Sequence, residues 1–179
     1  MTPDLDRWLP DPGLRVFHSR VSTVGCQPLW EAARAVRLAD TALLGRLVRW
    51  RIPGTPAGET FDELFRRPPF IVLEDHELER VLVAGLVGTI WTLRRDYPQL
   101  SRPEEYLAWS RRGTARVLFA HWVEPVDAER ASLSTEARVE AFGVQGRVGV
   151  RAIRPLVARF QHLIGSDGIE AAIRRAERR

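Results

Sequence analysis

The stretch ERVLVAGLVGTIWTL, residues 79–93, is the most apolar segment of the chain and decides how the rest is interpreted. Its uncharged core lies between Arg80 and Arg94 and is far shorter than the ~20 residues that a membrane-spanning helix needs. Valine, isoleucine, threonine and two glycines within twelve residues disfavour an ordinary helix. A phosphate-binding loop would end in Lys-Ser or Lys-Thr, which this stretch lacks. We therefore predict a central β-strand that is apolar on both faces.

Two glycines and one tryptophan add detail to this predicted strand. Gly85 and Gly88 are three positions apart, so they belong to opposite faces of a strand. Glycines inside a strand often mark a bend, and we expect this strand to bend around a helix. Trp91 stands at its end and is a candidate ligand contact.

The length and composition predict one soluble domain. The 179 residues are 45% hydrophobic and 28% charged, which is ordinary for a globular protein. We expect an extended N-terminal arm at residues 1–13 and a single domain at residues 14–179. The acidic, proline-containing N-terminus does not resemble a signal peptide, and the single cysteine, Cys26, excludes an internal disulfide. We expect a cytoplasmic protein that does not insert into membranes.

All 27 basic residues are arginines, and the net charge is +4. Arginine suits phosphate and carboxylate recognition, so an arginine-rich interaction module that contacts an acidic partner is one functional hypothesis. The arginines are spread along the chain, however, and a compositional bias explains them better. We do not predict nucleic-acid binding.

Hydrophobic periodicity and turn residues divide the chain into elements. Strands are predicted at 14–23, 70–75, 79–91, 114–125 and 131–142. Helices are predicted at 27–38, from Asp40 to about Arg51 with Asp40 as the cap, near Pro103, and from about Val150 to the end of the chain. An extra short strand could lie in 93–113, and we expect GSDG at 165–168 to interrupt the last helix.

This order predicts an α+β fold in which a curved antiparallel sheet wraps around a long C-terminal helix. The apolar face of that helix would include residues such as Val150, Ile153, Phe160 and Ile164, and would bury the apolar face of the sheet. A cavity between the sheet and the helix is then expected.

Several phrases of the sequence resemble uncharacterised bacterial members of the START/Bet v 1/polyketide-cyclase superfamily, also called SRPBCC. They are His18 in the first strand, Pro69-Phe70, GLVGTIW, Val123-Glu124-Pro125 and STEARV at 134–139. The resemblance extends from about Leu14 to Glu177 and implies the helix-grip fold. It also implies a hydrophobic or amphipathic small molecule bound between sheet and helix, without a cofactor. None of these phrases is a catalytic signature.

Two histidines are the candidates for chemistry. His18 and His121 fall on apolar faces of their predicted strands, where each is either packed in the core or directed into the cavity. In the cavity a neutral imidazole could bind a ligand by a hydrogen bond or transfer a proton near pH 7. No metal site is expected, because HELER at 76–80 lacks the second histidine of a zinc-binding helix and His121 and Glu124 lie on opposite faces of a strand.

Four further residues are candidate ligand contacts. Thr135 is the hydroxyl residue on the small inward face of the strand at 131–142, and Trp91 and Trp109 could form walls of a pocket. Glu136 and Arg138 fall on the outer face, where they are either solvated or recruited to the mouth of the pocket. The complete set of predicted ligand-binding residues is His18, Trp91, Trp109, His121, Thr135 and Arg138.

We therefore predict the binding of a hydrophobic or amphipathic small molecule in a cavity. The alternative is a cyclase, dehydratase or hydrolase that uses His18 or His121 as acid or base. The arginine-rich interaction module is the third hypothesis. The sequence leaves open the identity of the ligand, the presence of catalysis and the possibility of a homodimer.

Overall fold

The computed structural model describes residues 2–41, 43–92, 94 and 96–178, with the side chains of residues 156–165 left out. One curved antiparallel sheet has the strand order β1-β5-β4-β3-β2. Its strands are β1 (Leu14–Ser22), β2 (Ile71–His76), β3 (Val81–Gly88), β4 (Ala115–Pro125) and β5 (Ala131–Ala141). These are the five predicted strands, and the described part of 93–113 contains no sixth.

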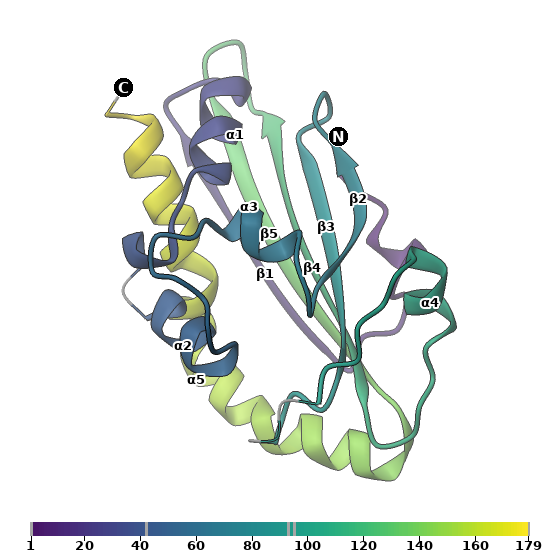
Figure 1. Ribbon diagram of the computed structural model, residues 1–179. Coiled ribbons are helices and arrows are strands. Elements are labelled where there is room, and N and C mark those ends of the chain that lie inside the picture. The colour runs from purple at the N-terminus through teal and green to yellow at the C-terminus, as the bar shows by residue number, and fades with distance from the viewer. Residues whose placement is uncertain (1, 42, 93, 95, 179) are drawn as a thin grey trace.

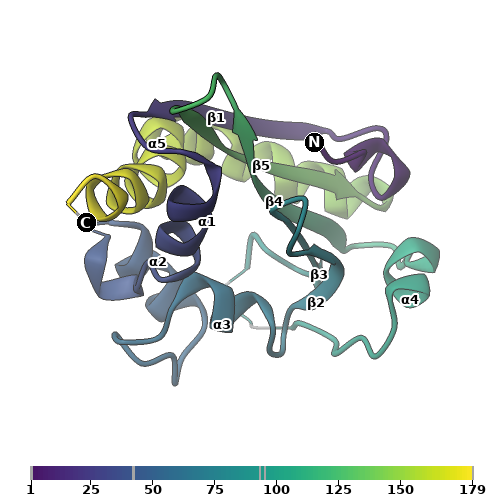
Figure 2. The same cartoon turned by 90° about the horizontal axis from the view of Figure 1, so that it is seen from above.

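The helices lie on both sides of this sheet. They are η1 (Leu5–Arg7), α1 (Cys26–Arg34), η2 (Leu38–Asp40), α2 (Leu44–Arg51), α3 (Phe61–Phe65), α4 (Pro103–Ala108) and α5 (Gly143–Ala176). The sheet curves around α1, α2, α3 and α5 (Figure 1), whereas α4 lies on the opposite, convex side (Figure 2). This is the α+β helix-grip arrangement that the sequence predicted.

Both faces of β3 are buried, as its apolar sequence predicted. On the concave face, Leu82 packs with residues of α1 and α5. On the convex face, Val83 packs with Trp8 and Leu9 of the N-terminal segment and with Tyr106 of α4. The N-terminal segment is therefore not simply extended, because it turns through η1 and covers the outside of the sheet.

The two glycines of β3 permit close contacts with other segments of the chain. A Cβ atom on Gly85 would lie 2.7 Å from the ring of Tyr106, and one on Gly88 would lie 2.1 Å from the carbonyl oxygen of Asp96. The register between β3 and β4 is unbroken, and the register between β2 and β3 shifts between Val72 and Glu74.

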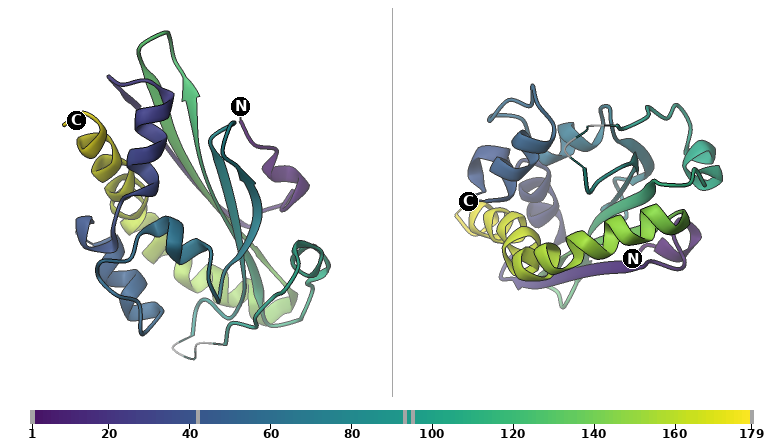
Figure 3. Two further views of the ribbon diagram at one scale, coloured as in Figure 1. Left: turned by 45° about the horizontal axis from the view of Figure 1, so that its top comes forward. Right: turned by 90° about the horizontal axis from the view of Figure 1, so that it is seen from below.

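The C-terminal helix α5 is longer than predicted, because GSDG at 165–168 does not interrupt it. It changes direction midway (Figure 1) and runs beside β1 (Figure 3). Pro155 lies in its interior, where the missing N–H and the ring of a proline kink a helix. Val150 is buried as expected, but most of the predicted apolar face, and His162, lie among the side chains left out.

The start of α2 also differs from the prediction. Asp40 belongs to η2, and α2 begins at Leu44. The carboxylate of Asp167, on α5, accepts hydrogen bonds from the backbone N–H groups of Leu43 and Leu44 at 3.0 and 3.3 Å. A side chain from a distant helix therefore takes the capping role that we assigned to Asp40.

Candidate functional site

A cavity of ≈ 200 Å³ lies between the concave face of the sheet and helices α1, α2, α3 and α5. Its wall is mostly apolar, and four phenylalanines contribute to it, namely Phe61, Phe65, Phe70 and Phe119. An engineered apolar cavity of about 150 Å³ is known to hold benzene. The space therefore suits one substituted ring.

Three polar side chains form a row across the floor of this cavity. His18 on β1 lies opposite Thr135 on β5, and Thr135 lies opposite His121 on β4. Residues directly opposite each other on antiparallel strands share a face and have Cβ atoms about 5 Å apart. All three residues line the cavity. The structure thus brings together three of the six ligand contacts predicted from the sequence.

The surroundings of His121 shift its pKa. Its ring packs near Trp30 and Phe65, with centroids 6.4 and 5.4 Å away. Burial lowers the pKa of His121 to about 4; the charge of Asp62 opposes this change and that of Arg66 adds to it. The imidazole is therefore neutral at pH 7. Within the described part of the chain, neither this imidazole nor the hydroxyl of Thr135 has a hydrogen-bond partner.

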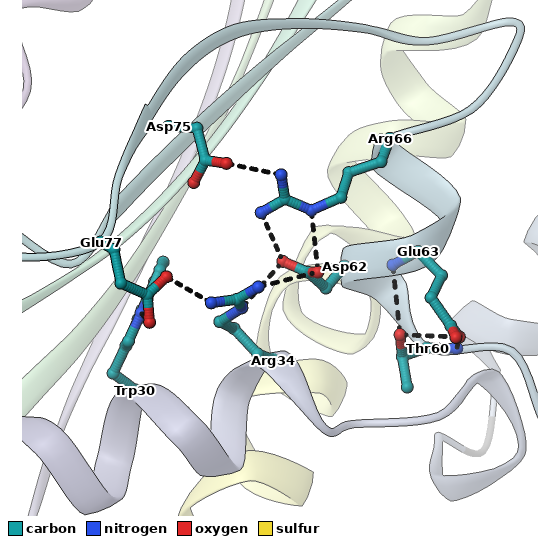
Figure 4. Close-up of polar contacts among 8 residues, drawn as sticks. All are labelled: Trp30, Arg34, Thr60, Asp62, Glu63, Arg66, Asp75 and Glu77. Carbon is teal, nitrogen blue, oxygen red and sulfur yellow. Dashed lines mark hydrogen bonds and ion pairs between the residues drawn. The ribbon is translucent and has the colours of Figure 1, made fainter.

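Charged side chains gather at one side of the cavity, in a group that we call the Asp62 cluster: Arg34, Asp62, Arg66, Asp75 and Glu77 (Figure 4). Arg34 and Asp62 line the cavity. Asp62 accepts hydrogen bonds from Arg34 at 3.1 and 3.4 Å and from Arg66 at 2.9 and 3.2 Å. Arg34 also binds Glu77, and Arg66 also binds Asp75. The cluster thus joins α1 and α3 to the β2–β3 hairpin.

The local sequence around Asp62 explains its position. Thr60 caps α3 by accepting a hydrogen bond from the N–H of Glu63 at 3.1 Å, and the Glu63 carboxylate accepts one from the N–H of Thr60 at 2.8 Å. This reciprocal pair starts the helix and leaves Asp62 in its first turn, directed toward α1. Burial disfavours the ionised form of Asp62, but its hydrogen bonds with the two guanidinium groups outweigh burial and lower its pKa.

Sequence reasoning missed the Asp62 cluster. The i, i+4 spacing of Asp62 and Arg66 is a signal for an ion pair on a helix. Nothing in the sequence indicates that Arg34, 28 positions earlier, completes the group.

The other three predicted contacts lie outside the cavity. Trp91 packs against α5, since a Cβ atom on Gly149 would lie 2.2 Å from its ring. Trp109 lies on the convex side, where its indole N–H donates to Thr114 at 2.9 Å. Arg138 also belongs to the convex face.

The convex position of Arg138 is not solvated, contrary to one of our two expectations. Its guanidinium binds Glu136 at 2.5 Å, the backbone carbonyl of Leu9 at 2.9 Å and the carboxylate of Asp6. The exposed fractions of the Arg138 and Glu136 side chains are 8% and 3%. The N-terminal segment buries this ion pair, and the contacts of Arg138 with Asp6 and Leu9 hold the segment against the sheet.

Other types of site are not found in the part of the chain that the structure describes. Within it, no group of three or more histidine, cysteine, aspartate or glutamate residues is arranged to hold a metal ion. Among the same residues, no helix is both long and apolar enough to cross a membrane.

No family model and no curated protein matches the chain. Three solved structures match it over most of its length. A hypothetical protein of Helicobacter pylori, jhp0584, is 13% identical, with 97% of this chain and 94% of that chain covered and a TM-score of 0.45. The Zhui aromatase/cyclase of Streptomyces sp. R1128 is 16% identical, with coverage of 93% and 94% and a TM-score of 0.35. Norcoclaurine synthase of Thalictrum flavum is 12% identical, with coverage of 88% and 94% and a TM-score of 0.35. Because these scores are low, we base no functional argument on them.

Proposed function

We propose that this protein binds one small, mostly apolar molecule in the cavity between the concave face of the sheet and helices α1, α2, α3 and α5. One observation carries the proposal: an apolar space of ≈ 200 Å³ contains a row of three polar side chains on adjacent strands. Ligand sites in proteins combine apolar walls with a few polar groups that orient the ligand.

The low pKa of His121 favours binding over acid/base catalysis by this residue. A general base or acid is most effective when its pKa is near the working pH. Burial lowers the pKa of His121 to about 4, so at pH 7 it has no proton to give as an acid and is a weak base. A neutral imidazole remains well suited to accept a hydrogen bond from a ligand.

Toluene is a suitable probe for the apolar part of this proposal, because it has a single ring and the cavity has room for one ring. We expect added toluene to shift the NMR signals of cavity residues on β1, β4 and β5 in the 179-residue chain. At a free concentration ten times its Kd, a ligand that binds only the folded state raises the free energy of unfolding by about 1.4 kcal/mol.

A cavity-filling variant provides the control for this experiment. Ala137 lines the cavity, so Ala137→Leu should occupy the space and abolish the effect of toluene. Ala108 is exposed on α4, on the other side of the sheet, and Ala108→Leu should retain it. The proposal fails if toluene has no effect on the native protein, or if Ala137→Leu responds to toluene as the native protein does.

A further inference from the structure

The charged groups beside the cavity already neutralise one another, and this restricts the ligands that the cavity can hold. Arg34 is the one arginine among the described lining residues, and its guanidinium binds Asp62 and Glu77. Arg66, the second cation of the Asp62 cluster, binds Asp62 and Asp75. Three carboxylates therefore surround two guanidinium groups. A ligand carboxylate would find no unused cation here and would meet an excess of negative charge.

A positively charged ligand is opposed by a different effect. Burial in this cavity disfavours the protonated form of His121, and the nearby charge of Asp62 does not compensate for it. An ammonium group of a ligand at the same place would meet the same loss of hydration. A direct hydrogen bond from that ammonium group to Asp62 would have to compete with those that Arg34 and Arg66 donate.

The polar row, in contrast, matches a hydroxyl group. A neutral imidazole has one nitrogen that donates and one that accepts, and a threonine hydroxyl can do both. His121 and Thr135 occupy opposite positions on neighbouring strands and face the cavity together. A ligand hydroxyl placed between them can donate to one and accept from the other. A carboxylate could accept hydrogen bonds from both groups and an ammonium group could donate to both, so selection against these two ligands rests on the charge effects described above.

We propose that the cavity selects an uncharged, single-ring ligand that carries a hydroxyl group, as a phenol or a cyclic alcohol does, over carboxylates and amines of the same size. This inference rests on the binding function proposed above and specifies the charge and polarity of its ligand. The ring would lie against Phe65 and Phe119, and the hydroxyl would lie between His121 and Thr135.

Four probes of similar size test this selectivity: toluene, p-cresol, benzoate and benzylamine. Each is titrated into the 179-residue chain at pH 7, and its Kd is measured from NMR shifts of cavity residues. We expect p-cresol to bind about fivefold more tightly than toluene, as one additional neutral hydrogen bond allows. Benzoate and benzylamine should bind at least tenfold more weakly than p-cresol.

Two threonine variants locate the source of the preference. Thr135→Val removes the hydroxyl with little change of shape, and we expect the ratio of the toluene Kd to the p-cresol Kd to fall toward one. Thr2→Val makes the same change at an exposed position and should keep the native ratio.

The outcomes separate the selectivity from the binding function. If neither toluene nor p-cresol shifts the signals of cavity residues, the binding function itself is wrong. If toluene binds but p-cresol binds no more tightly, or if benzoate or benzylamine equals p-cresol, the binding function stands and the inferred selectivity is overturned. A native ratio in Thr135→Val would overturn the role given to the polar row.

Discussion

The low pKa of His121 should make the stability of the protein depend on pH in a defined window. An unfolded chain has histidine pKa values of about 6.5, whereas burial lowers the pKa of His121 in the folded protein to about 4. Between these two values the unfolded chain binds more protons than the folded chain. The free energy of unfolding therefore falls as the pH falls through this window, and above pH 7 this residue has no further effect.

The size of the effect follows from the same two pKa values. One proton of difference changes the free energy of unfolding by about 1.4 kcal/mol per pH unit. From pH 6.5 to pH 5, the loss due to His121 is thus about 2 kcal/mol. For a chain of this length that corresponds to roughly 4–8 °C in Tm. The window ends at pH 5 because carboxyl groups begin to take up protons below it.

Urea denaturation at pH 7, 6.5, 6, 5.5 and 5 measures this dependence directly. His121→Gln keeps hydrogen-bonding capacity but cannot titrate, so its stability should lose most of the slope seen in the native protein. His76→Gln changes an exposed histidine on β2 and serves as the matched control. Equal slopes for the native protein and His121→Gln would refute the reasoning, because the pH dependence would then arise elsewhere.

Three further substitutions test packing and helix capping elsewhere in the fold. Gly149→Ala forces a Cβ atom toward the ring of Trp91, and we expect it to lower the free energy of unfolding, measured in urea, by about 1–3 kcal/mol. Gly58→Ala is the control, because a Cβ atom there meets open space, and it should lower the free energy of unfolding far less. Asp167→Ala removes the cap of α2 and should lower the free energy of unfolding by about 1 kcal/mol. Amide hydrogen exchange should become faster only at the start of α2. Unchanged exchange there would contradict the capping role. Trp8→Ala empties a buried position on the convex face and should cost about 3 kcal/mol in urea, and a loss below 1 kcal/mol would show that the N-terminal segment is not part of the core.

The sheet and its inward polar residues could be predicted from the sequence because strands repeat every two residues. Alternation alone assigned His18, His121 and Thr135 to apolar faces. Their alignment in one row depends on the register between strands that are far apart in the chain, and no local pattern specifies it.

The residues whose positions differ from expectation lie where this periodicity ends or where a distant segment intervenes. Trp91 lies beyond Gly88, the last residue of β3, so the alternation of the strand no longer sets the direction of the Trp91 side chain. The outer face of β5 was assigned correctly, but its ion pair at Arg138 is buried by a proline-containing segment that we expected to be extended. The Asp62 cluster combines side chains from α1, α3 and the β2–β3 hairpin, which only the folded chain brings together.

The strand order has a consequence for how the protein is made. β1, formed by residues 14–22, pairs with β5, formed by residues 131–141, and with no other strand of the described sheet. During synthesis β1 must therefore wait until more than a hundred further residues have left the ribosome. Pairings of such large sequence separation form slowly, and an unpaired strand edge promotes association between chains. Because β1 supplies His18, the polar row of the cavity is completed only at this late step.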